Sequence, residues 1–330
     1  MKQTNISVFI PHSGCKNTCS FCNQKTISGC DRPVTPEQLE EILSEQQPVL
    51  ESNDTRAQIA FFGGSFTAID RDYMCDLLKT ASEFTKKYPE QFCGIRCSTR
   101  PDCIDSEILD ILKHYGMTAI ELGAQSMNDD VLLANRRGHT AEDVRRASKL
   151  IKQYGFELGL QMMTGLYMDK PEYCIQTAEE FIKLCCDTVR IYPTVILKGT
   201  ELDRLKNEGL YDSFDFDQTV ELCTTLLQMF ESAGIPVIRL GLHASRDVEE
   251  NMTGGVYHQA LREICESRAL LRLEQEQAPE AGKYVFYTDR HNISKVTGHR
   301  GCNREALLKR GVTFKIKEEA GTLLRAERIG

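Results

Sequence analysis

The sequence predicts an α/β fold, an open partial TIM-like barrel of six β/α units, (β/α)6, followed by a small C-terminal α+β extension. Strand-length apolar runs alternate six or seven times with segments of helical period. No hairpin signal joins successive runs, so the strands should be parallel and joined by right-handed crossovers. Six units are too few to close an eight-stranded barrel.

The strands are predicted where short runs are rich in apolar and β-branched residues. These runs cover 5–10, 57–62, 94–98, 117–122, 156–162 and 188–191, with 236–240 as a candidate seventh strand. Helices are expected from 35 onward and over 70–84, 105–114, 140–154, 172–185 and 216–233. Thr35 fits the N-cap of the first helix and Pro36 its first turn.

A change of pattern near residue 242 predicts a barrel core over 1–241 and a C-terminal extension over 242–330. The extension contains a charge-rich helical segment, two short strand-like runs and a second helix. Those segments are 260–273, 284–287, 312–316 and about 303–309. We interpret this mixture as a small appended α+β unit, with substrate or RNA binding as its candidate role.

The composition restricts the classes of protein to which this chain can belong. Of 330 residues, 41% are hydrophobic, which suffices for one large domain plus an extension. No apolar run reaches the length of a membrane span, and the N-terminus lacks the pattern of a signal peptide. A soluble, cytoplasmic protein that does not bind membranes is therefore expected. Fourteen cysteines favour a reducing compartment over a disulfide framework.

The net charge of −8 argues against a protein whose whole surface binds nucleic acid. Locally the balance reverses, because 283–316 contains eight Lys/Arg and two Asp/Glu, a net +6. Four aromatic residues lie among these charges: Tyr284, Phe286, Tyr287 and Phe314. The mixture could hold a phosphate backbone and stack bases, as in tRNA binding. The commoner interpretation is an ordinary solvated face.

Three cysteines, Cys15, Cys19 and Cys22, lie within eight residues just after the first predicted strand. The residues between them are mostly polar, so a buried apolar role for the thiols is not favoured. Three thiolates can hold an iron–sulfur cluster with one iron left open. Phe21 would cover it from solvent. The competing interpretation is a zinc site with His12 as fourth ligand.

This spacing, with an aromatic residue before the last cysteine, resembles the signature of the radical S-adenosylmethionine (SAM) enzymes. The resemblance implies a [4Fe-4S] cluster whose open iron chelates the amino and carboxylate groups of SAM. It also implies an external electron donor. Reductive cleavage of SAM would then yield a 5′-deoxyadenosyl radical that abstracts hydrogen from a substrate.

Further polar motifs follow successive strands, where a barrel of this kind carries its chemistry. Gly63, Gly64 and Ser65 follow the second strand, and the resemblance implies that such a glycine-rich segment contacts the SAM amino group. From the residues alone, two glycines after a strand usually form only a tight turn. Ser98 takes the position of a glutamate that helps bind SAM in related enzymes.

Gln125 and Arg137, twelve residues apart, complete the candidate site. They resemble a pair that holds SAM in oxygen-independent coproporphyrinogen oxidases and in the radical SAM half of the Elongator catalytic subunit. An amide and a guanidinium suit ribose hydroxyls and a carboxylate. Two alternatives remain open. Arg137 could be a surface charge at the start of a helix, or the neighbouring Arg136 could hold SAM instead of it. A capping or packing role is expected for His139.

Additional segments favour the Elongator-like branch over the porphyrin branch. They are Thr-Arg-Pro-Asp at 99–102, Ile-Tyr-Pro-Thr at 191–194, 198–202 and 255–258, within a resemblance that covers about 5–265. The Elongator subunit continues into an acetyltransferase domain, and this chain ends before one would be complete. We therefore do not assume that this chain performs the wobble-uridine modification made by that subunit.

The leading hypothesis is a radical SAM enzyme whose substrate is undetermined, with tRNA as a candidate. Two alternatives remain at this point: a zinc-stabilised RNA-binding or scaffold protein, and a porphyrinogen oxidase-like enzyme. The sequence predicts neither the reductant, the oligomeric state, the catalytic side chains, nor whether SAM is consumed.

Overall fold

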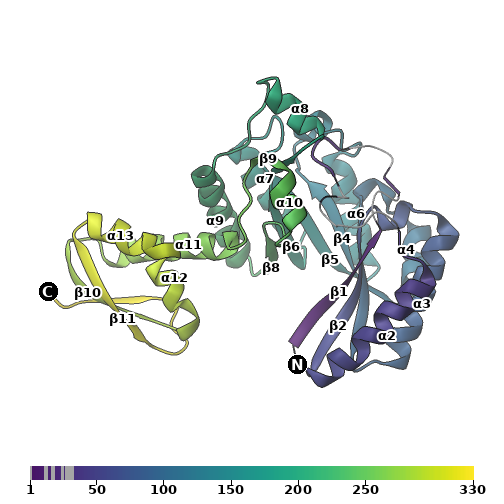
Figure 1. Ribbon diagram of the computed structural model, residues 1–330, viewed down its shortest axis with the longest axis horizontal. Helices are drawn as coiled ribbons and strands as arrows, with labels where there is room; N and C mark the ends of the chain where they lie inside the picture. Colours follow the sequence, from purple (N-terminus) through teal and green to yellow (C-terminus); the bar gives the residue numbers. More distant parts are fainter. Residues whose placement is uncertain (1, 11–13, 16–18, 24–25, 27–32) are drawn as a thin grey trace.

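The computed structural model describes residues 2–10, 14–15, 19–23, 26 and 33–330. Seven parallel strands form one sheet in the order β1-β2-β3-β4-β5-β6-β8, curled into half a barrel (Figure 1). The strands are β1 (Lys2–Ile10), β2 (Thr55–Gly63), β3 (Phe92–Thr99), β4 (Met117–Gln125), β5 (Glu157–Thr164), β6 (Thr188–Pro193) and β8 (Val237–Leu240). The predicted open barrel is confirmed, and the candidate seventh strand belongs to it.

Helices connect successive strands of the sheet, and those of nine residues or more pack on its outer face. The connecting helices are α2 (Pro36–Ser52), α3 (Arg71–Lys87), α4 (Ser106–His114), α5 (Asp129–Ala134), α6 (Ala141–Gln153), α7 (Pro171–Lys183), α8 (Glu201–Asn207) and α9 (Phe216–Ser232), with short 3-10 turns η1 (Phe66–Ala68) and η2 (Pro101–Cys103). The predicted start of α2 is confirmed. The Thr35 hydroxyl accepts from the Gln38 N–H, and the Gln38 side chain accepts from the Thr35 N–H.

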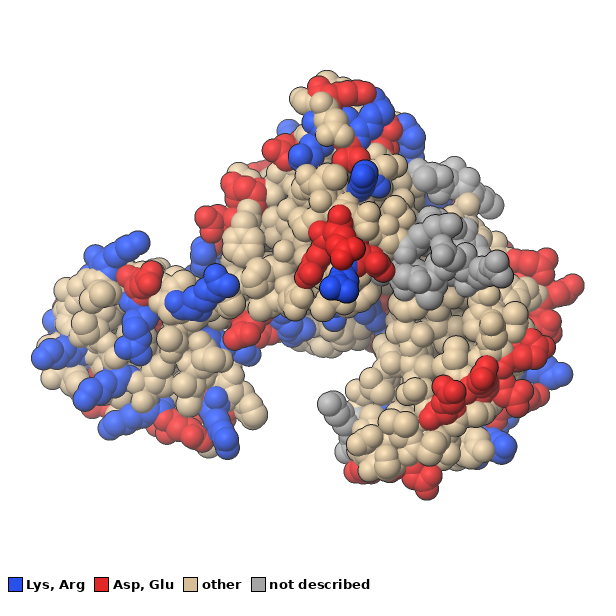
Figure 2. Space-filling model, viewed as in Figure 1, with Lys and Arg blue, Asp and Glu red and all other residues tan. Residues whose placement is uncertain are grey.

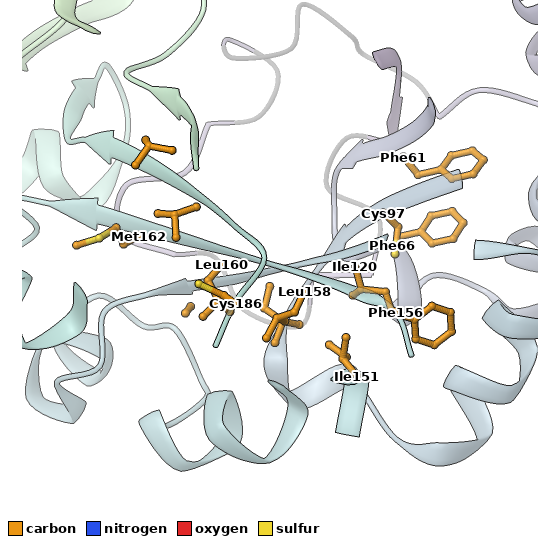
Figure 3. Close-up of a cluster of buried hydrophobic side chains, with 14 of the residues drawn as sticks. Phe61, Phe66, Cys97, Ile120, Ile151, Phe156, Leu158, Leu160, Met162 and Cys186 are labelled. Atoms are coloured by element: carbon orange, nitrogen blue, oxygen red, sulfur yellow. The ribbon is translucent and has the colours of Figure 1, made fainter. Parts of the chain in front are cut away.

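The large hydrophobic core lies between the sheet and its helices (Figure 3). Successive side chains of a strand point to opposite faces, so one set enters this core and the other lines the concave inner face. Ile120 and Leu122 of β4 are fully buried in the core, whereas Glu121 between them faces inward. The inner face is therefore polar where Glu121 projects from it.

Burial raises the pKa of the Cys97 thiol, as expected for a cysteine that packs in the core as a small hydrophobe.

The C-terminal lobe has its own three-stranded sheet in the order β11-β10-β12. Its elements are β10 (Gly282–Thr288), η3 (Arg290–Asn292), α12 (Ile293–Thr297), η4 (His299–Gly301), α13 (Cys302–Lys309), β11 (Val312–Glu318) and β12 (Arg325–Arg328). Helix α11 (Leu261–Gln277) runs from the barrel into the lobe (Figure 1). Leu261 packs in the barrel core, and Leu270 packs in the core of the lobe. The division at residue 241 stays a prediction.

The aromatic residues of the basic segment are largely inside the lobe. Tyr284, Phe286 and Phe314 are buried in its hydrophobic core. Tyr287 is half-buried, and the Arg325 guanidinium lies 3.9 Å from its ring centroid. Three of the four rings are therefore not exposed for the base stacking that the composition allowed. Their apolar area does more for the fold when it is buried.

Several short elements were not predicted. They include α5, α8, the antiparallel pair β7 (Val195–Leu197) and β9 (Met252–Gly255), α10 (Arg246–Asn251) and β12. Strand β12 is largely exposed, and its residues Arg-Ala-Glu-Arg lack the apolar alternation that marks a half-buried strand. None of the described helices is long and apolar enough to cross a membrane.

Candidate active site

A cavity of about 270 Å³ lies at the carboxyl ends of the strands. All ten predicted site residues line it: Cys15, Cys19, Phe21, Cys22, Gly63, Gly64, Ser65, Ser98, Gln125 and Arg137. Four lining residues were not predicted: Thr99, Arg100, Gly123 and Gln161. The carboxyl ends of parallel strands meet at one edge of the sheet, which explains how segments distant in the sequence converge.

The three cysteines of the motif differ in exposure. Cys15 is exposed, Cys22 is half-buried, and Cys19 is buried with 8% of its surface exposed. Within the described residues, no three Cys, His, Asp or Glu side chains could hold one metal ion. A zinc ion needs its thiolates within about 2.3 Å of one point, whereas each iron of a cluster takes its own thiolate. His12, the candidate fourth zinc ligand, lies outside the described residues.

Arg137 is the most heavily engaged of the predicted side chains. Its Nη1 donates to Cys19 Sγ at 3.0 Å, and its Nη2 donates to the Gly123 carbonyl at 2.5 Å. The guanidinium lies 5.8 Å from the centroid of the Phe21 ring. Arg137 is only 6% exposed, and its Nε has no partner among the described residues. The surface-charge alternative is therefore wrong for Arg137.

Arg136 points elsewhere. Its guanidinium pairs with Glu201 at 2.7 Å, and more than half of its side chain is exposed. The alternative in which Arg136 replaces Arg137 in the cavity is therefore wrong. Of the two roles expected for His139, capping is wrong, because the Thr140 side chain caps α6, whereas the burial of His139 agrees with packing.

Gln125 ends β4 in an unusual conformation, with φ +68°. Its side-chain Oε1 is buried and has no hydrogen-bond partner in the described part of the chain. Its Nε2 lies so close to Gly123 that a Cβ on Gly123 would approach it to 2.9 Å. A glycine at 123 therefore makes room for the amide of Gln125.

The glycine-rich segment after β2 lies directly beside the first strand. A Cβ on Gly63 would sit 3.3 Å from the Ile10 backbone, and Gly63 has φ +102°. Both facts favour glycine at 63. Ser65 is 2% exposed, and its hydroxyl lies 3.9 Å from Cys15 Sγ. The segment thus borders the cysteine loop.

At the floor of the cavity, the side chain of Gln161 is hydrogen-bonded to Ser98 and to Glu121. Gln161 Nε2 donates to Ser98 Oγ at 3.1 Å and to Glu121 Oε2 at 2.7 Å. Ser98, at the position where related enzymes carry a glutamate, is thus bonded to Gln161, which is also bonded to the buried Glu121 of β4. Gln161 could have been found from its inward register on β5, two residues beyond Gly159.

Glu121 is 1% exposed and accepts from two arginines as well as from Gln161. Arg96 Nη1 lies 2.6 Å away, and Arg190 Nε and Nη2 lie at 2.6 and 2.8 Å. Burial alone would raise the pKa of Glu121, but its bonds to Arg190 and the charge of Arg96 outweigh this and hold the pKa below its usual value. The carboxylate is therefore ionised.

Arg100 also reaches the cavity wall, although it was not predicted as a site residue. It is 4% exposed and forms a bidentate pair with Asp102 at 2.9 and 3.0 Å. The Thr-Arg-Pro-Asp segment was the available signal for it. The pairing fixes a positive group near Cys19 without leaving it unpaired.

A larger depression of about 790 Å³ lies at the amino ends of the strands. Its charged groups are paired, including Arg96 with Glu157 at 2.9 Å and Lys152 with Asp187 at 3.0 Å. The smaller cavity carries the three thiols of the motif, together with the unpartnered Gln125 Oε1 and Arg137 Nε. It is therefore the better candidate for chemistry.

Comparisons with known proteins agree with the predicted resemblance. Elongator complex protein 3 of Dictyostelium discoideum is 28% identical over 236 residues, which cover 66% of this chain and 41% of that protein. The chain thus spans less than half the length of this relative. Among solved structures, an N-terminally truncated Elp3 of Methanocaldococcus infernus has a TM-score of 0.63 at 19% identity, covering 84% of this chain and 63% of that one.

Coproporphyrinogen III oxidase (HemN) from Escherichia coli has a TM-score of 0.51 at 17% identity, covering 71% of this chain and 53% of that one. At such identities the two structures support the fold alone. The Radical_SAM C-terminal domain matches residues 186–270. The Radical SAM superfamily matches residues 9–184, more than half of the chain, and the protein therefore belongs to the radical SAM superfamily.

Proposed function

We propose that this enzyme of the radical SAM class binds a [4Fe-4S] cluster through Cys15, Cys19 and Cys22, and binds SAM in the adjoining cavity. One observation carries the proposal. Two buried polar side chains, Gln125 and Arg137, face the cavity that the three thiols line, and each keeps an atom without a partner among the described residues. Such atoms are costly to bury unless a ligand completes them.

The residues present fit this pair of groups. Three thiols provide ligands for three irons and leave a fourth iron open. Arg137 Nε offers a donor and Gln125 Oε1 an acceptor, which match the carboxylate and the hydroxyl or amino groups of SAM. Gly123 leaves the space between them free of a side chain.

When bound, the two cofactors supply a one-electron cleavage of the SAM C–S bond that yields a 5′-deoxyadenosyl radical, with electrons from an external donor. The chain itself contributes positioning and charge. Arg137 donates to the sulfur of Cys19, and hydrogen bonds to ligand sulfurs raise the reduction potential of a cluster. The Phe21 ring lies against the guanidinium of Arg137, 5.8 Å from it.

The decisive experiment uses anaerobically purified and reconstituted protein. We expect iron, sulfide and a brown colour, and formation of 5′-deoxyadenosine on reduction in the presence of SAM. Zinc without iron would support the scaffold alternative. Iron without any SAM cleavage would contradict the proposed reaction. Tight tetrapyrrole binding in an absorbance titration would favour the porphyrinogen oxidase alternative, which rests on fold alone.

We further propose that the substrate is an RNA, with tRNA as the candidate, held by the C-terminal lobe. Lys and Arg side chains spread over the lobe, while acidic side chains gather over α2 and α3 (Figure 2). Seven of the eight basic residues of 283–316 are exposed: Lys283, Arg290, Arg300, Arg304, Lys309, Arg310 and Lys315. With the aromatic rings buried, binding would rely on phosphate contacts.

A gel-shift titration with bulk tRNA at several salt concentrations tests this. Reversing Lys309 and Lys315 to Glu should weaken binding and reduce its salt slope by roughly one per lost phosphate contact. The matched control reverses Lys79 and Lys86, two exposed lysines of α3 on the barrel. No binding at low salt would remove the RNA proposal without touching the SAM chemistry. A cytoplasmic location likewise stays a prediction.

A further inference from the structure

Strand β4 ends in a strained turn at the cavity. The Ser126 N–H donates to the Ala124 carbonyl at 2.9 Å, and the residue between them, Gln125, has φ +68°. A bond across one residue with positive φ defines the rarer and more strained form of the γ-turn. Such strain persists only where surrounding contacts over-determine it, and it clusters at functional sites.

The turn coincides with an irregularity in the sheet. The register between β4 and β5 shifts between Gly123 and Gln125, so Ala124 is an extra residue in the ladder. The bulge brings the Gln125 amide back over Gly123, with Oε1 buried and without a partner in the described part of the chain. Gln125 thus lines the cavity with an acceptor that no described residue uses.

His139 holds the same carbonyl from the other side. Its Nε2 lies 3.2 Å from the Ala124 oxygen, and the side chain is 5% exposed. Because a carbonyl only accepts, Nε2 must carry the proton. Burial, and then the charge of Arg137, lower the pKa of His139 to about 4, with Arg100 and Asp102 as the other charged neighbours. The imidazole is therefore neutral, with one ring proton.

We propose that His139 is a positioning residue for SAM: its Nε2–H bond to Ala124 holds the strained turn so that Gln125 Oε1 accepts a hydrogen bond from SAM. The inference rests on the proposed function, since it takes SAM as the ligand. Packing alone would not require a donor at Nε2. The donor matters because it stabilises a backbone conformation that the sheet ladder does not.

Three variants separate the hydrogen bond from the volume of the ring. His139→Gln keeps an N–H near Nε2, His139→Asn places its amide too far back to reach Ala124, and His139→Leu fills the space without a donor. SAM affinity is measured by equilibrium dialysis on unreduced, cluster-loaded protein, alongside iron per chain. We expect Asn and Leu to weaken SAM binding roughly tenfold, the worth of about one hydrogen bond. Gln should stay within about threefold of wild type, and iron content should not change.

Wild-type affinity in the Asn and Leu variants would overturn the inference, and so would equal weakening in all three, which would point to ring volume. Should Leu fail to retain iron, the comparison of Gln with Asn still decides. His114→Leu, at an exposed histidine of α4, is the control for a lost imidazole. If wild-type protein does not bind SAM, the proposed function fails and this inference with it. If wild type binds and the variants bind equally, only the role of His139 fails.

Discussion

The inner face of the half-barrel holds two sets of buried polar side chains, one at its floor and one at its rim. At the floor, Glu121 accepts from Arg96, Arg190 and Gln161, and its carboxylate is fully used. At the rim, four residues further along the same strand, Gln125 Oε1 has no partner among the described residues.

The difference shows which buried polar groups find all their hydrogen-bond partners within the chain and which do not. A satisfied buried network stabilises and specifies the fold, whereas a buried polar atom without a partner costs free energy until something binds it. Mutations at the floor should therefore lower the free energy of unfolding, and mutations at the rim should weaken ligand binding. Three predictions test this separation, and a fourth tests whether every unpartnered buried polar group marks a ligand site.

The largest effect is expected at the rim. Cys19→Ala should abolish both the cluster and SAM cleavage, because a three-thiolate site loses a ligand that cannot be replaced. The fold should survive, since Cys19 lies on a loop outside the strands. Iron analysis and circular dichroism check the two parts. Full iron content in the variant would contradict the assignment.

At the floor, Glu121→Gln should lower the free energy of unfolding by about 3–5 kcal/mol, because it removes the counter-charge of Arg190 and leaves Arg96 with Glu157 alone. Urea denaturation measures it. The control is Glu107→Gln, which breaks an exposed pair with Arg71 and should cost less than about 1 kcal/mol. Equal losses of stability at both sites would show that the buried network at the floor contributes no more than an exposed ion pair.

Arg137→Lys keeps the charge at the rim but loses the planar fork that reaches Cys19 and Gly123 together. SAM binding should weaken by about 1.5–3 kcal/mol, the range for hydrogen bonds to charged groups. Equilibrium dialysis checks this. Arg136→Lys, which changes only the surface pair with Glu201, should bind SAM normally. If Arg137→Lys bound SAM normally but lost much of its stability, the assignment of the rim to ligand binding would be wrong.

Glu274 of α11 tests whether every unpartnered polar group marks a ligand site. It is fully buried in the lobe, far from the cavity residues in sequence, and neither carboxyl oxygen has a partner in the described part of the chain. Burial raises its pKa to about 8, although nearby Asn303 opposes this. The protein thus meets the cost by keeping the carboxyl protonated, without a ligand.

Between pH 4.5 and pH 8 the unfolded chain binds fewer protons at Glu274 than the folded one, so the free energy of unfolding falls as pH rises. Glu274→Gln removes this dependence. Its stability relative to wild type should increase by roughly 1 kcal/mol from pH 5 to pH 8, less than the full linkage because relaxation softens burial. Thermal unfolding at both pH values checks it. A pH-independent difference would mean that Glu274 ionises normally.

Much of the fold was predictable because its signals are local. Strand-length runs, helix periods and the Thr35 cap each depend on a few neighbouring residues. The missed strand β12 has no such signal, because it is a polar edge strand that exists only through its pairing with β10. The aromatic residues of the lobe show the same limit. Composition could not tell whether Tyr284 and Phe286 face solvent or a core.

By itself, the sequence determined the order of strands and helices, the spacing of the three cysteines and the residue types at each strand end, since all of these are properties of short stretches of chain. Only the tertiary structure decided which side chains meet. Arg137 reaches Cys19 across 118 residues, and Arg136 beside it turns to the surface. The physical reason is that such contacts depend on where parallel strands converge and on backbone strain such as that at Gln125, and neither is encoded in the spacing of neighbouring residues.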